Sequence, residues 1–371
     1  MTAADQDRIF DAAFNVLRQG LGARAFPGAA TAITYRGRLV ALRSFGRFTY
    51  EPDSPTIQRE TIFDLASLTK VVATTTMAMI LHERGVLDLD APVVSVLPEF
   101  RTEEWHREEV TVRMLLAHTS GLPAYARLFE KAKTRAEMVL AAARTVLAAP
   151  PGTRVEYSDI GFIVLGEILQ RLAGEALDSF CYREIFGPLQ MLRTSWVPPS
   201  AWRNTIPPTE DDRAWRGRVI QGEVNDENAS VMDGIAGHAG VFSTAEDLAR
   251  FAEMILAGGA PILRPETVKL FATSRYGAPG GPQHALGWDV PTPPSQAGRL
   301  FSASSIGHLG FTGTSLWSDP EQQVSVTLLT NRTWPDRQSQ GIKNVRPRFH
   351  DAVIEALEKE TRDTGASRRK K

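Results

Sequence analysis

Residues 63–81 read FDLASLTKVVATTTMAMIL, and here an extended segment gives way to an apolar helix. Ser67 and Lys70 stand three positions apart, which on a helix places both side chains on one face. A serine hydroxyl needs a base before it can attack a carbonyl carbon, and a lysine whose pKa is lowered by desolvation can be that base. The stretch therefore predicts either a nucleophile with its base or a polar helix start.

A second serine–lysine pair with the same spacing occurs near the C-terminus, at Ser367 and Lys370. This copy has no extended segment before it and no apolar helix after it, whereas Ser67 has both. The local context therefore favours Ser67 as a nucleophile, with Lys70 as its base. The structural alternative, in which Ser67 only begins a helix, stays open at this point.

Hydrophobic periodicity orders the elements around this stretch. Residues 3–20 are helical in pattern, and two short apolar runs follow, hinged at Arg36–Gly37 as a hairpin. The pattern is mostly helical from about 66 to 190, and residues 193–237 have the composition of long loops. The remaining predicted elements are a helix through Leu256 opened by a Ser243–Glu246 capping box, strands in HALGWDV, SSIGHLG, GTSLWSD and QVSVTLLTN, and a final helix over 341–359.

The two ends of the chain are expected to share one sheet, because an isolated two-stranded hairpin is only marginally stable. The predicted fold class is α+β: an antiparallel β-sheet flanked by the N- and C-terminal helices, with a mostly helical lobe inserted. We expect residues 1–65 and 238–371 to form the discontinuous sheet domain, 66–237 the inserted lobe, and 361–371 a flexible basic tail. A substrate site is expected in the crevice between the sheet edge and the lobe.

Composition argues against several classes of protein. The chain has 371 residues, 43% of them hydrophobic, with 42 basic and 43 acidic side chains and a net charge of −1. So balanced a charge predicts no nucleic-acid partner, and no apolar run is long enough to span a membrane. The N-terminus does not read as a secretory signal, so we expect a cytoplasmic protein, or a periplasmic one if the natural chain carries a leader.

Cysteine usage and motif content bear on metals and cofactors. The single cysteine, Cys181, cannot form an internal disulfide and is expected to be a buried, inert thiol. No His-Glu-x-x-His motif, paired cysteines or glycine-rich phosphate loop occurs, so we expect no metal and no cofactor. No Gly-x-Ser-x-Gly elbow occurs either, which argues against an α/β-hydrolase. The oligomeric state stays open.

A second candidate element is Tyr157–Ser158–Asp159, in the turn before the strongly apolar segment DIGFIVLGEILQRLAG. A phenol beside Lys70 could relay a proton to a leaving group, with its pKa lowered by the ammonium. Among the six tyrosines, only Tyr157 is followed two residues later by Asn or Asp. The alternative is structural: Asp159 caps the helix, and Tyr157 packs as an amphipathic aromatic ring.

A third candidate element, His308–Leu309–Gly310–Phe311, lies among the C-terminal strands. Glycine in a strand often marks close approach of a ligand to the backbone, and a strand edge could give one N–H to an oxyanion hole, with Ser67 giving the other. A rival His–Ala–Gly at His238 precedes a helix, so His238 is expected to be a loop histidine that either lines the pocket or does not. His118 is interpreted as a structural element at a helix end.

Together and in this order, the three elements resemble the serine β-lactamase and penicillin-recognising superfamily. The resemblance is to the class C-like branch, which also contains DD-peptidases, D-amino-acid peptidases and family VIII carboxylesterases. It extends over nearly the whole chain, through segments such as GVLDLDAPVVSVLPEF, VTVRMLLAHTSGLP and GIAGHAGVFSTAEDLARF. It implies the β-lactamase/transpeptidase-like fold, which agrees with the architecture expected from the elements.

The resemblance also implies roles for individual residues. Ser67 would be the acylated nucleophile, Lys70 its base and Tyr157 the proton relay. The amides of Ser67 and Phe311 would form the oxyanion hole. The substrate-binding residues would be Asp159, His308, Gly310 and Phe311.

Two positions depart from the β-lactamase pattern. Asp159 stands where an asparagine is commoner, and His308 stands where class C β-lactamases have a lysine. A neutral histidine attracts the carboxylate of a β-lactam poorly, so both changes make the pocket less favourable to an anionic substrate. Arg332, in TNRT, is either a replacement cation or a solvated arginine at a strand end.

These observations predict a serine hydrolase that forms an acyl-enzyme on a small ester, an amide or a short D-amino-acid peptide. We expect esterase-like or D-amino-acid amidase or peptidase-like activity, with β-lactamase activity weak or absent. One alternative is a true class C-like β-lactamase or a DD-carboxypeptidase. An alternative of another class is a slowly acylating penicillin-binding sensor.

Overall fold

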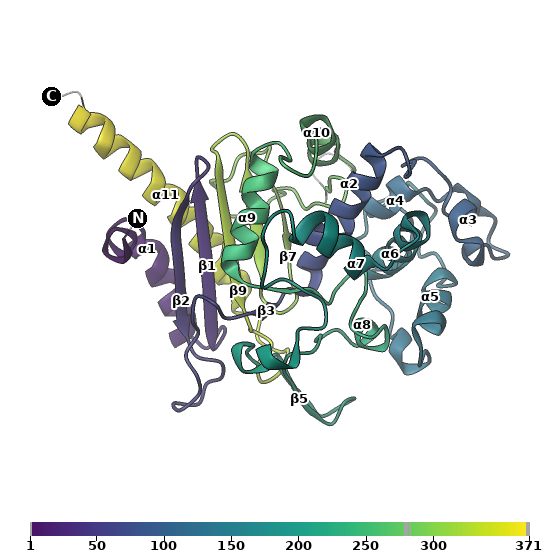
Figure 1. Ribbon diagram of the computed structural model, residues 1–371, viewed down its shortest axis with the longest axis horizontal. Coiled ribbons are helices and arrows are strands. Elements are labelled where there is room, and N and C mark those ends of the chain that lie inside the picture. Colours follow the sequence, from purple (N-terminus) through teal and green to yellow (C-terminus); the bar gives the residue numbers. More distant parts are fainter. Residues whose placement is uncertain (1, 278–280, 282, 369–371) are drawn as a thin grey trace.

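The computed structural model describes residues 2–277, 281 and 283–368. At its centre is a five-stranded antiparallel sheet with the strand order β2-β1-β9-β8-β7 (Figure 1). The strands are β1 (Gly28–Tyr35), β2 (Leu39–Gly46), β7 (Ile306–Leu309), β8 (Ser315–Asp319) and β9 (Val324–Thr330). Because β1 pairs with β9, the two ends of the chain share one sheet. The predicted α+β fold class is confirmed.

Helices cover both faces of this sheet. The terminal helices α1 (Ala3–Gly22) and α11 (Ile342–Arg368) pack on one face, and α9 (Ala245–Leu256) packs on the other (Figure 1). Successive side chains of a strand point to opposite faces. Accordingly, Ile33 of β1 lies in the core shared with α1 and α11, whereas its neighbour Ala32 lies in the core shared with α9.

Local sequence explains both the turn between β1 and β2 and the start of helix α1. Arg36 and Gly37 join β1 to β2 with φ of 51° and 73°, the left-handed pair that a tight two-residue hairpin requires. Helix α1 is capped by Thr2, whose hydroxyl accepts from the Asp5 amide while the Asp5 carboxylate accepts from the Thr2 amide. Both elements therefore follow from signals within a few residues of their ends.

The segment between β2 and β7 forms most of the lobe beside the sheet (Figure 1). Its α-helices before α9 are α2 (Thr76–Glu83), α3 (Val93–Val96), α4 (Val112–Leu116), α5 (Arg135–Ala143), α6 (Asp159–Ala173), α7 (Leu177–Cys181) and α8 (Glu227–Val231). α10 (Pro265–Thr273) follows α9. Short paired strands connect the parts: β3 (Phe63–Asp64) with β6 (Phe242–Ser243), and β4 (Glu210–Asp212) with β5 (Arg218–Ile220).

The predicted helix that follows Ser67 is built from three pieces. A 3-10 turn, η1 (Ala66–Leu68), holds the serine, and a π-helical segment, η2 (Lys70–Thr75), leads into α2. Ala66 has φ of 47°, a left-handed conformation that is uncommon for a residue with a side chain. The wider π winding and the strained turn both lie at the predicted nucleophile, where such departures from α geometry are often found.

Three predicted boundaries are wrong. HALGWDV is no strand, because His284 and Asp289 form only isolated bridges. The cap of α9 is Thr244, not Ser243, since the Thr244 hydroxyl accepts from the Asp247 amide. Helix α11 continues to Arg368, beyond the end predicted at 359, and residues 369–371 lie outside the described part.

Two further features concern Cys181 and the membrane. Cys181 is buried and free, and burial raises the pKa of its thiol well above the ordinary value, so the thiolate is disfavoured. Of the helices in the described residues, none has the length and apolar character needed to cross a bilayer.

Candidate active site

Asp64 fixes the turn that carries Ser67. One oxygen of its buried carboxyl group accepts from the Ala66 amide at 2.8 Å, and the other accepts from the Asn225 amide at 2.7 Å. Burial raises the pKa of Asp64 to about 6, although the two hydrogen bonds favour the carboxylate and oppose this shift. The carboxyl group therefore ties the strained turn at Ala66 to the loop that contains Asn225.

Lys70 lies fully buried at the meeting point of three remote segments. Its Nζ donates to Ser67 Oγ at 3.0 Å, to Asp159 Oδ1 at 2.6 Å and to the carbonyl oxygen of His238 at 2.9 Å. Burial lowers the pKa of Lys70, and the adjacent Asp159 carboxylate opposes that shift. Because burial and the Asp159 carboxylate shift the Lys70 pKa in opposite directions, the amine can exist in both protonation states. It can therefore exchange a proton with Ser67, as a general base must.

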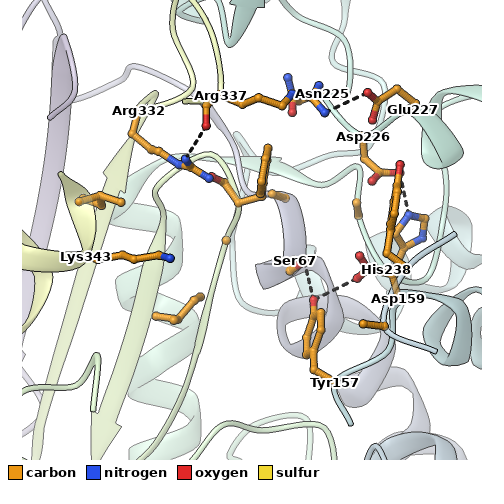
Figure 2. Close-up of a pocket in the computed structure, with 18 of the residues that line it drawn as sticks. Ser67, Tyr157, Asp159, Asn225, Asp226, Glu227, His238, Arg332, Arg337 and Lys343 are labelled. Atoms are coloured by element: carbon orange, nitrogen blue, oxygen red, sulfur yellow. Dashed lines mark hydrogen bonds and ion pairs between the residues drawn. The ribbon is translucent and has the colours of Figure 1, made fainter. Parts of the chain in front are cut away.

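Tyr157 completes the contact around the serine. Its hydroxyl lies 2.8 Å from Ser67 Oγ and 3.0 Å from Asp159 Oδ1 (Figure 2). The sequence predicted a phenol whose pKa is lowered by the ammonium, and this is wrong: burial, followed by the charge of Asp159, raises the pKa of Tyr157 well above 10. The phenol is therefore neutral, and it can pass a proton only by accepting one as it donates another.

Ser158, not Asp159, caps helix α6. The Ser158 hydroxyl accepts from the Gly161 amide at 3.0 Å, which leaves the Asp159 carboxylate to contact Lys70 and Tyr157. His118 holds the same turn from behind, because its Nδ1 accepts from the Ser158 amide at 3.0 Å and its ring lies 4.9 Å from that of Tyr157. The structural role expected of His118 is thus the support of the Tyr157 turn.

The third element borders the site along β7. His308 is 2% exposed, its Nδ1 lies 2.8 Å from the Leu309 carbonyl oxygen, and burial lowers the pKa of its ring to about 4. It is therefore neutral at pH 7 and provides no cation. A side chain at Gly310 would place its Cβ 1.9 Å from Thr314 Oγ1 and 2.5 Å from the Leu65 carbonyl oxygen, so only glycine fits there.

Hydroxyl groups join this element to the serine turn. Thr312 Oγ1 donates to the Asp64 carbonyl at 2.8 Å, and Thr314 Oγ1 donates to the Leu65 carbonyl at 2.9 Å. Phe311, which precedes Thr312, lines the pocket and is 46% exposed. The loop that carries the Phe311 amide is therefore fixed directly to the segment that carries the Ser67 amide.

Asp226 and His238 form a pair that the sequence did not indicate. His238 is 1% exposed, and its Nε2 lies 2.8 Å from Asp226 Oδ1 (Figure 2). Although burial opposes the shift, the contact with His238 lowers the pKa of Asp226 to about 2. The pair fixes the loop whose carbonyl oxygen accepts from Lys70. His238 also lines the pocket, one of the two outcomes considered from the sequence.

Ser67, Tyr157 and Asp159 line a cavity of about 470 Å³. Carboxylates of Asp226 and Glu227 lie at one side, and basic side chains from the C-terminal segment lie at the other (Figure 2). Lys343 points its amine into the cavity and forms no salt bridge within the described part of the chain. Arg337 instead binds Glu210 at 2.9 Å and Glu227 at 3.0 Å, which connects the two sides across the pocket.

Arg332 is neither a solvated arginine nor a free cation. It is 7% exposed, and its guanidinium donates to the carbonyl oxygens of Phe311 at 2.7 Å and Ser339 at 2.8 Å. Burial lowers the pKa of this guanidinium. Its donors are largely occupied by the backbone. Among the described residues, no cluster of histidine, cysteine and carboxylate side chains is suited to hold a metal ion.

Ser67 Oγ thus lies beside an amine and a phenol, at hydrogen-bonding distance from both. A family model described as Beta-lactamase matches residues 13–345. The chain belongs to this family.

Relatives in the β-lactamase family carry several activities in their names. The chain is 32% identical to an N-acetylmuramyl-L-alanine amidase of Bacillus subtilis (strain 168), over 84% of this chain and 78% of that protein. It is 31% identical to a putative D-alanyl-D-alanine carboxypeptidase of Escherichia coli (strain K12), over 73% of this chain and 69% of that protein.

Solved structures of similar fold include the hydrolase EstCE1, described as having promiscuous acyltransferase activity. It matches with a TM-score of 0.76 and 22% identity, over 95% of this chain and 100% of that one. A class C β-lactamase from Rhodobacter sphaeroides matches with a TM-score of 0.74 and 20% identity, over 94% and 99%. These likenesses establish the β-lactamase-like fold.

The contact between Asp159 and Lys70 predicts a shift in pH dependence. In Asp159→Asn, the carboxylate that favours the ammonium form is gone, so the Lys70 pKa falls. Since activity requires the neutral amine, the acidic limb of the kcat/KM profile is expected to move to lower pH. The measurement is a pH–rate profile on an ester whose hydrolysis releases a chromophore.

The matched control is Glu227→Gln, which removes a carboxylate that lines the same cavity without contacting Lys70. Its acidic limb should stay in place. An Asp159→Asn limb that stays in place or moves to higher pH would contradict the assignment of Lys70 as the base.

Proposed function

We propose that this protein is a serine hydrolase that forms an acyl-enzyme on Ser67 and releases the acyl group to water. The observation that carries the proposal is the contact of Ser67 Oγ with both Lys70 Nζ at 3.0 Å and the Tyr157 hydroxyl at 2.8 Å, at the wall of a cavity. A hydroxyl between an amine and a phenol can lose its proton to one and exchange protons with the other.

Acylation would need three proton transfers. Neutral Lys70 takes the Ser67 proton as Oγ forms a bond to the substrate carbonyl carbon, and the carbonyl oxygen becomes an oxyanion near the amides of Ser67 and Phe311. Collapse of this intermediate breaks the bond to the leaving group, which takes its proton from Tyr157. The Lys70 ammonium then returns a proton to the phenolate through Asp159 Oδ1, which lies 2.6 Å from Lys70 Nζ and 3.0 Å from the Tyr157 hydroxyl.

Deacylation would reverse these roles with water as the nucleophile. Water gives a proton to the amine–phenol pair as its oxygen attacks the ester carbon of acyl-Ser67. The carboxylic acid leaves, and Ser67 Oγ regains its proton. Asp159 is ionised before and after each transfer, and one of its carboxylate oxygens contacts both Lys70 Nζ at 2.6 Å and the Tyr157 hydroxyl at 3.0 Å.

The substrate we propose is an ester, or an amide of a D-amino-acid type, with β-lactamase activity weak or absent. Support comes from His308, which is buried and neutral where a β-lactamase would present a cation to the β-lactam carboxylate. The named activities of the relatives, an amidase and a putative carboxypeptidase, are compatible with amide cleavage by an acyl-enzyme.

A second candidate is a carboxypeptidase-like activity on a peptide that ends in a free carboxylate. Lys343 favours it, because its amine enters the cavity from α11 without a salt bridge in the described part of the chain. The cation that His308 cannot provide would then come from the other side of the pocket. The acyl-enzyme chemistry at Ser67 is the same for both candidates.

Covalent labelling tests the nucleophile. A fluorophosphonate probe should add its mass to the Ser67 peptide of the wild-type protein, and Ser67→Ala should lose both the label and ester turnover. Lys70→Ala should lower kcat by at least about 100-fold, since general-base catalysis contributes on that order. Intact-protein and peptide mass spectrometry reads the label; a label on another residue would overturn the assignment.

The same preparation distinguishes an enzyme from a sensor. With a p-nitrophenyl ester in excess, an enzyme releases many equivalents of p-nitrophenol for each equivalent of protein. A slowly acylating binding protein releases a single burst and stops. We expect multiple turnovers, because Ser67, Lys70 and Tyr157 are in contact.

Substitution of Lys343 decides between the two substrate candidates. If the peptide carboxylate pairs with this amine, Lys343→Met should raise KM for a D-alanyl-D-alanine peptide by up to about fivefold, the order expected of one exposed ion pair. KM for the same peptide with an amidated C-terminus should not change. Equal KM changes for the two peptides, or none, would remove the carboxypeptidase-like candidate.

A further inference from the structure

Arg346 contacts the backbone of the loop that follows β7. It lies in the first turns of α11 and is 5% exposed. One terminal nitrogen of its guanidinium donates to the Gly310 carbonyl oxygen at 3.1 Å and to the Thr314 carbonyl oxygen at 3.0 Å. The cation of a remote helix thus binds both ends of the five-residue turn that contains Phe311.

The Gly310 carbonyl belongs to the same peptide unit as the Phe311 N–H. Peptide units are planar, and in a trans unit the C=O and N–H point in opposite directions; this bond is not among the cis bonds of the chain. A cation that binds the oxygen therefore sets the direction of the N–H. It also draws electron density toward the oxygen and makes the N–H a stronger donor, as in cooperative hydrogen-bond chains.

Arg346 carries this charge without a salt bridge. Its hydrogen bonds run to carbonyl oxygens, and among the described residues no carboxylate pairs directly with it. Burial and then the nearby Arg332 lower the pKa of its guanidinium to about 9, although the charge of Asp289 opposes this shift, and its Nε has no partner within the described residues. A buried charge whose hydrogen bonds all run to carbonyl oxygens is costly for stability, so packing alone does not account for it.

We propose that Arg346 is a positioning residue that orients and polarises the Phe311 amide for the oxyanion of the acyl-transfer reaction. This inference rests on the proposed function, because an oxyanion exists only if Ser67 attacks a carbonyl. Arg346 itself touches no reacting atom. It acts through the Gly310–Phe311 peptide, whose hydrogen-bond donor becomes stronger as negative charge develops on the carbonyl oxygen.

Arg332 provides a matched control in the same loop. Its Nε donates to the Phe311 carbonyl oxygen at 2.7 Å, and its guanidinium carbon lies 4.5 Å from the centre of the Phe311 ring. The Phe311 carbonyl belongs to the next peptide unit, whose N–H group is that of Thr312. Arg332 therefore steadies the loop without acting on the Phe311 N–H, and its loss should not alter the strength of that donor.

The test is the carbonyl stretching frequency of the acyl-enzyme, read by rapid-scan infrared difference spectroscopy with a ¹³C=O-labelled p-nitrophenyl ester. In Arg346→Met the weaker hydrogen bond should move the band to higher frequency and slow deacylation. The slowing should be on the order of tenfold to a hundredfold, less than for removal of a whole oxyanion donor. KM should change little. In Arg332→Met the band should keep the wild-type frequency.

Arg346→Lys keeps the proposal testable if Arg346→Met does not fold. Lysine retains the charge but is shorter and lacks the planar guanidinium, so it should not reproduce both carbonyl contacts. Its band should lie above the wild-type frequency. A wild-type frequency and deacylation rate in either folded Arg346 variant would overturn the role of Arg346.

The outcomes also separate this inference from the proposed function. If the wild-type protein gives no ester carbonyl band that Ser67→Ala abolishes, the acyl-enzyme itself is refuted. If the band forms and shifts equally in Arg332→Met and Arg346→Met, general loosening of the loop explains it and the specific role of Arg346 fails.

Discussion

The site depends on one buried nitrogen atom. Lys70 Nζ has three hydrogen-bond acceptors, Ser67 Oγ, Asp159 Oδ1 and the His238 carbonyl oxygen, and each comes from a different part of the chain. An amine withdrawn from water must find such partners, so the fold cannot bury Lys70 unless those parts meet. The requirement that stabilises the lysine also places the serine and the tyrosine turn next to one another.

Around this nitrogen, the segments that form the pocket are fixed by charged side chains, most of which hydrogen-bond to backbone groups. Asp64 binds two amides, Arg332 and Arg346 bind carbonyl oxygens, and Asp226 binds the histidine behind the Lys70 contact. Ionic groups used in this way fix the direction of peptide units. The cavity therefore owes much of its shape to loops that contain little regular structure.

The fold and the centre of the candidate site could be predicted from the sequence because the patterns that mark them are local or periodic. Ser67 and Lys70 are three residues apart, and Tyr157 and Asp159 precede an apolar helix with a clear period. The sharing of one sheet by strands from both ends of the chain followed from the need to complete a sheet around the N-terminal hairpin. The turn at Asp159 was harder, since Ser158 could cap the helix equally well, and the pKa of Tyr157 depended on burial that no spacing reveals.

Asp226, Lys343 and Arg346 were not found because no local pattern marks what they contact. Asp226 pairs with His238 across an irregular loop, Lys343 enters the cavity without a salt bridge in the described residues, and Arg346 binds carbonyl oxygens of a remote loop. Arg346 contacts a carbonyl oxygen 36 residues earlier, and Asn225 contacts a carboxylate 161 residues earlier. Nothing in the composition of the loops around them marks such contacts. Hydrophobic periodicity describes which face of an element is buried, whereas these polar contacts depend on how irregular segments cross.

The pairing of β1 with β9 bears on how the protein matures. Thr31 of β1 donates its hydroxyl proton to the Thr327 carbonyl, 296 residues further along the chain. A nascent chain therefore carries Ser67, Lys70 and Tyr157 long before the strand that completes the sheet leaves the ribosome. Contacts so distant in sequence form slowly and late. Partly synthesised or truncated chains would hold Ser67 without the complete sheet beside it, so the whole pocket can form only when translation is nearly finished.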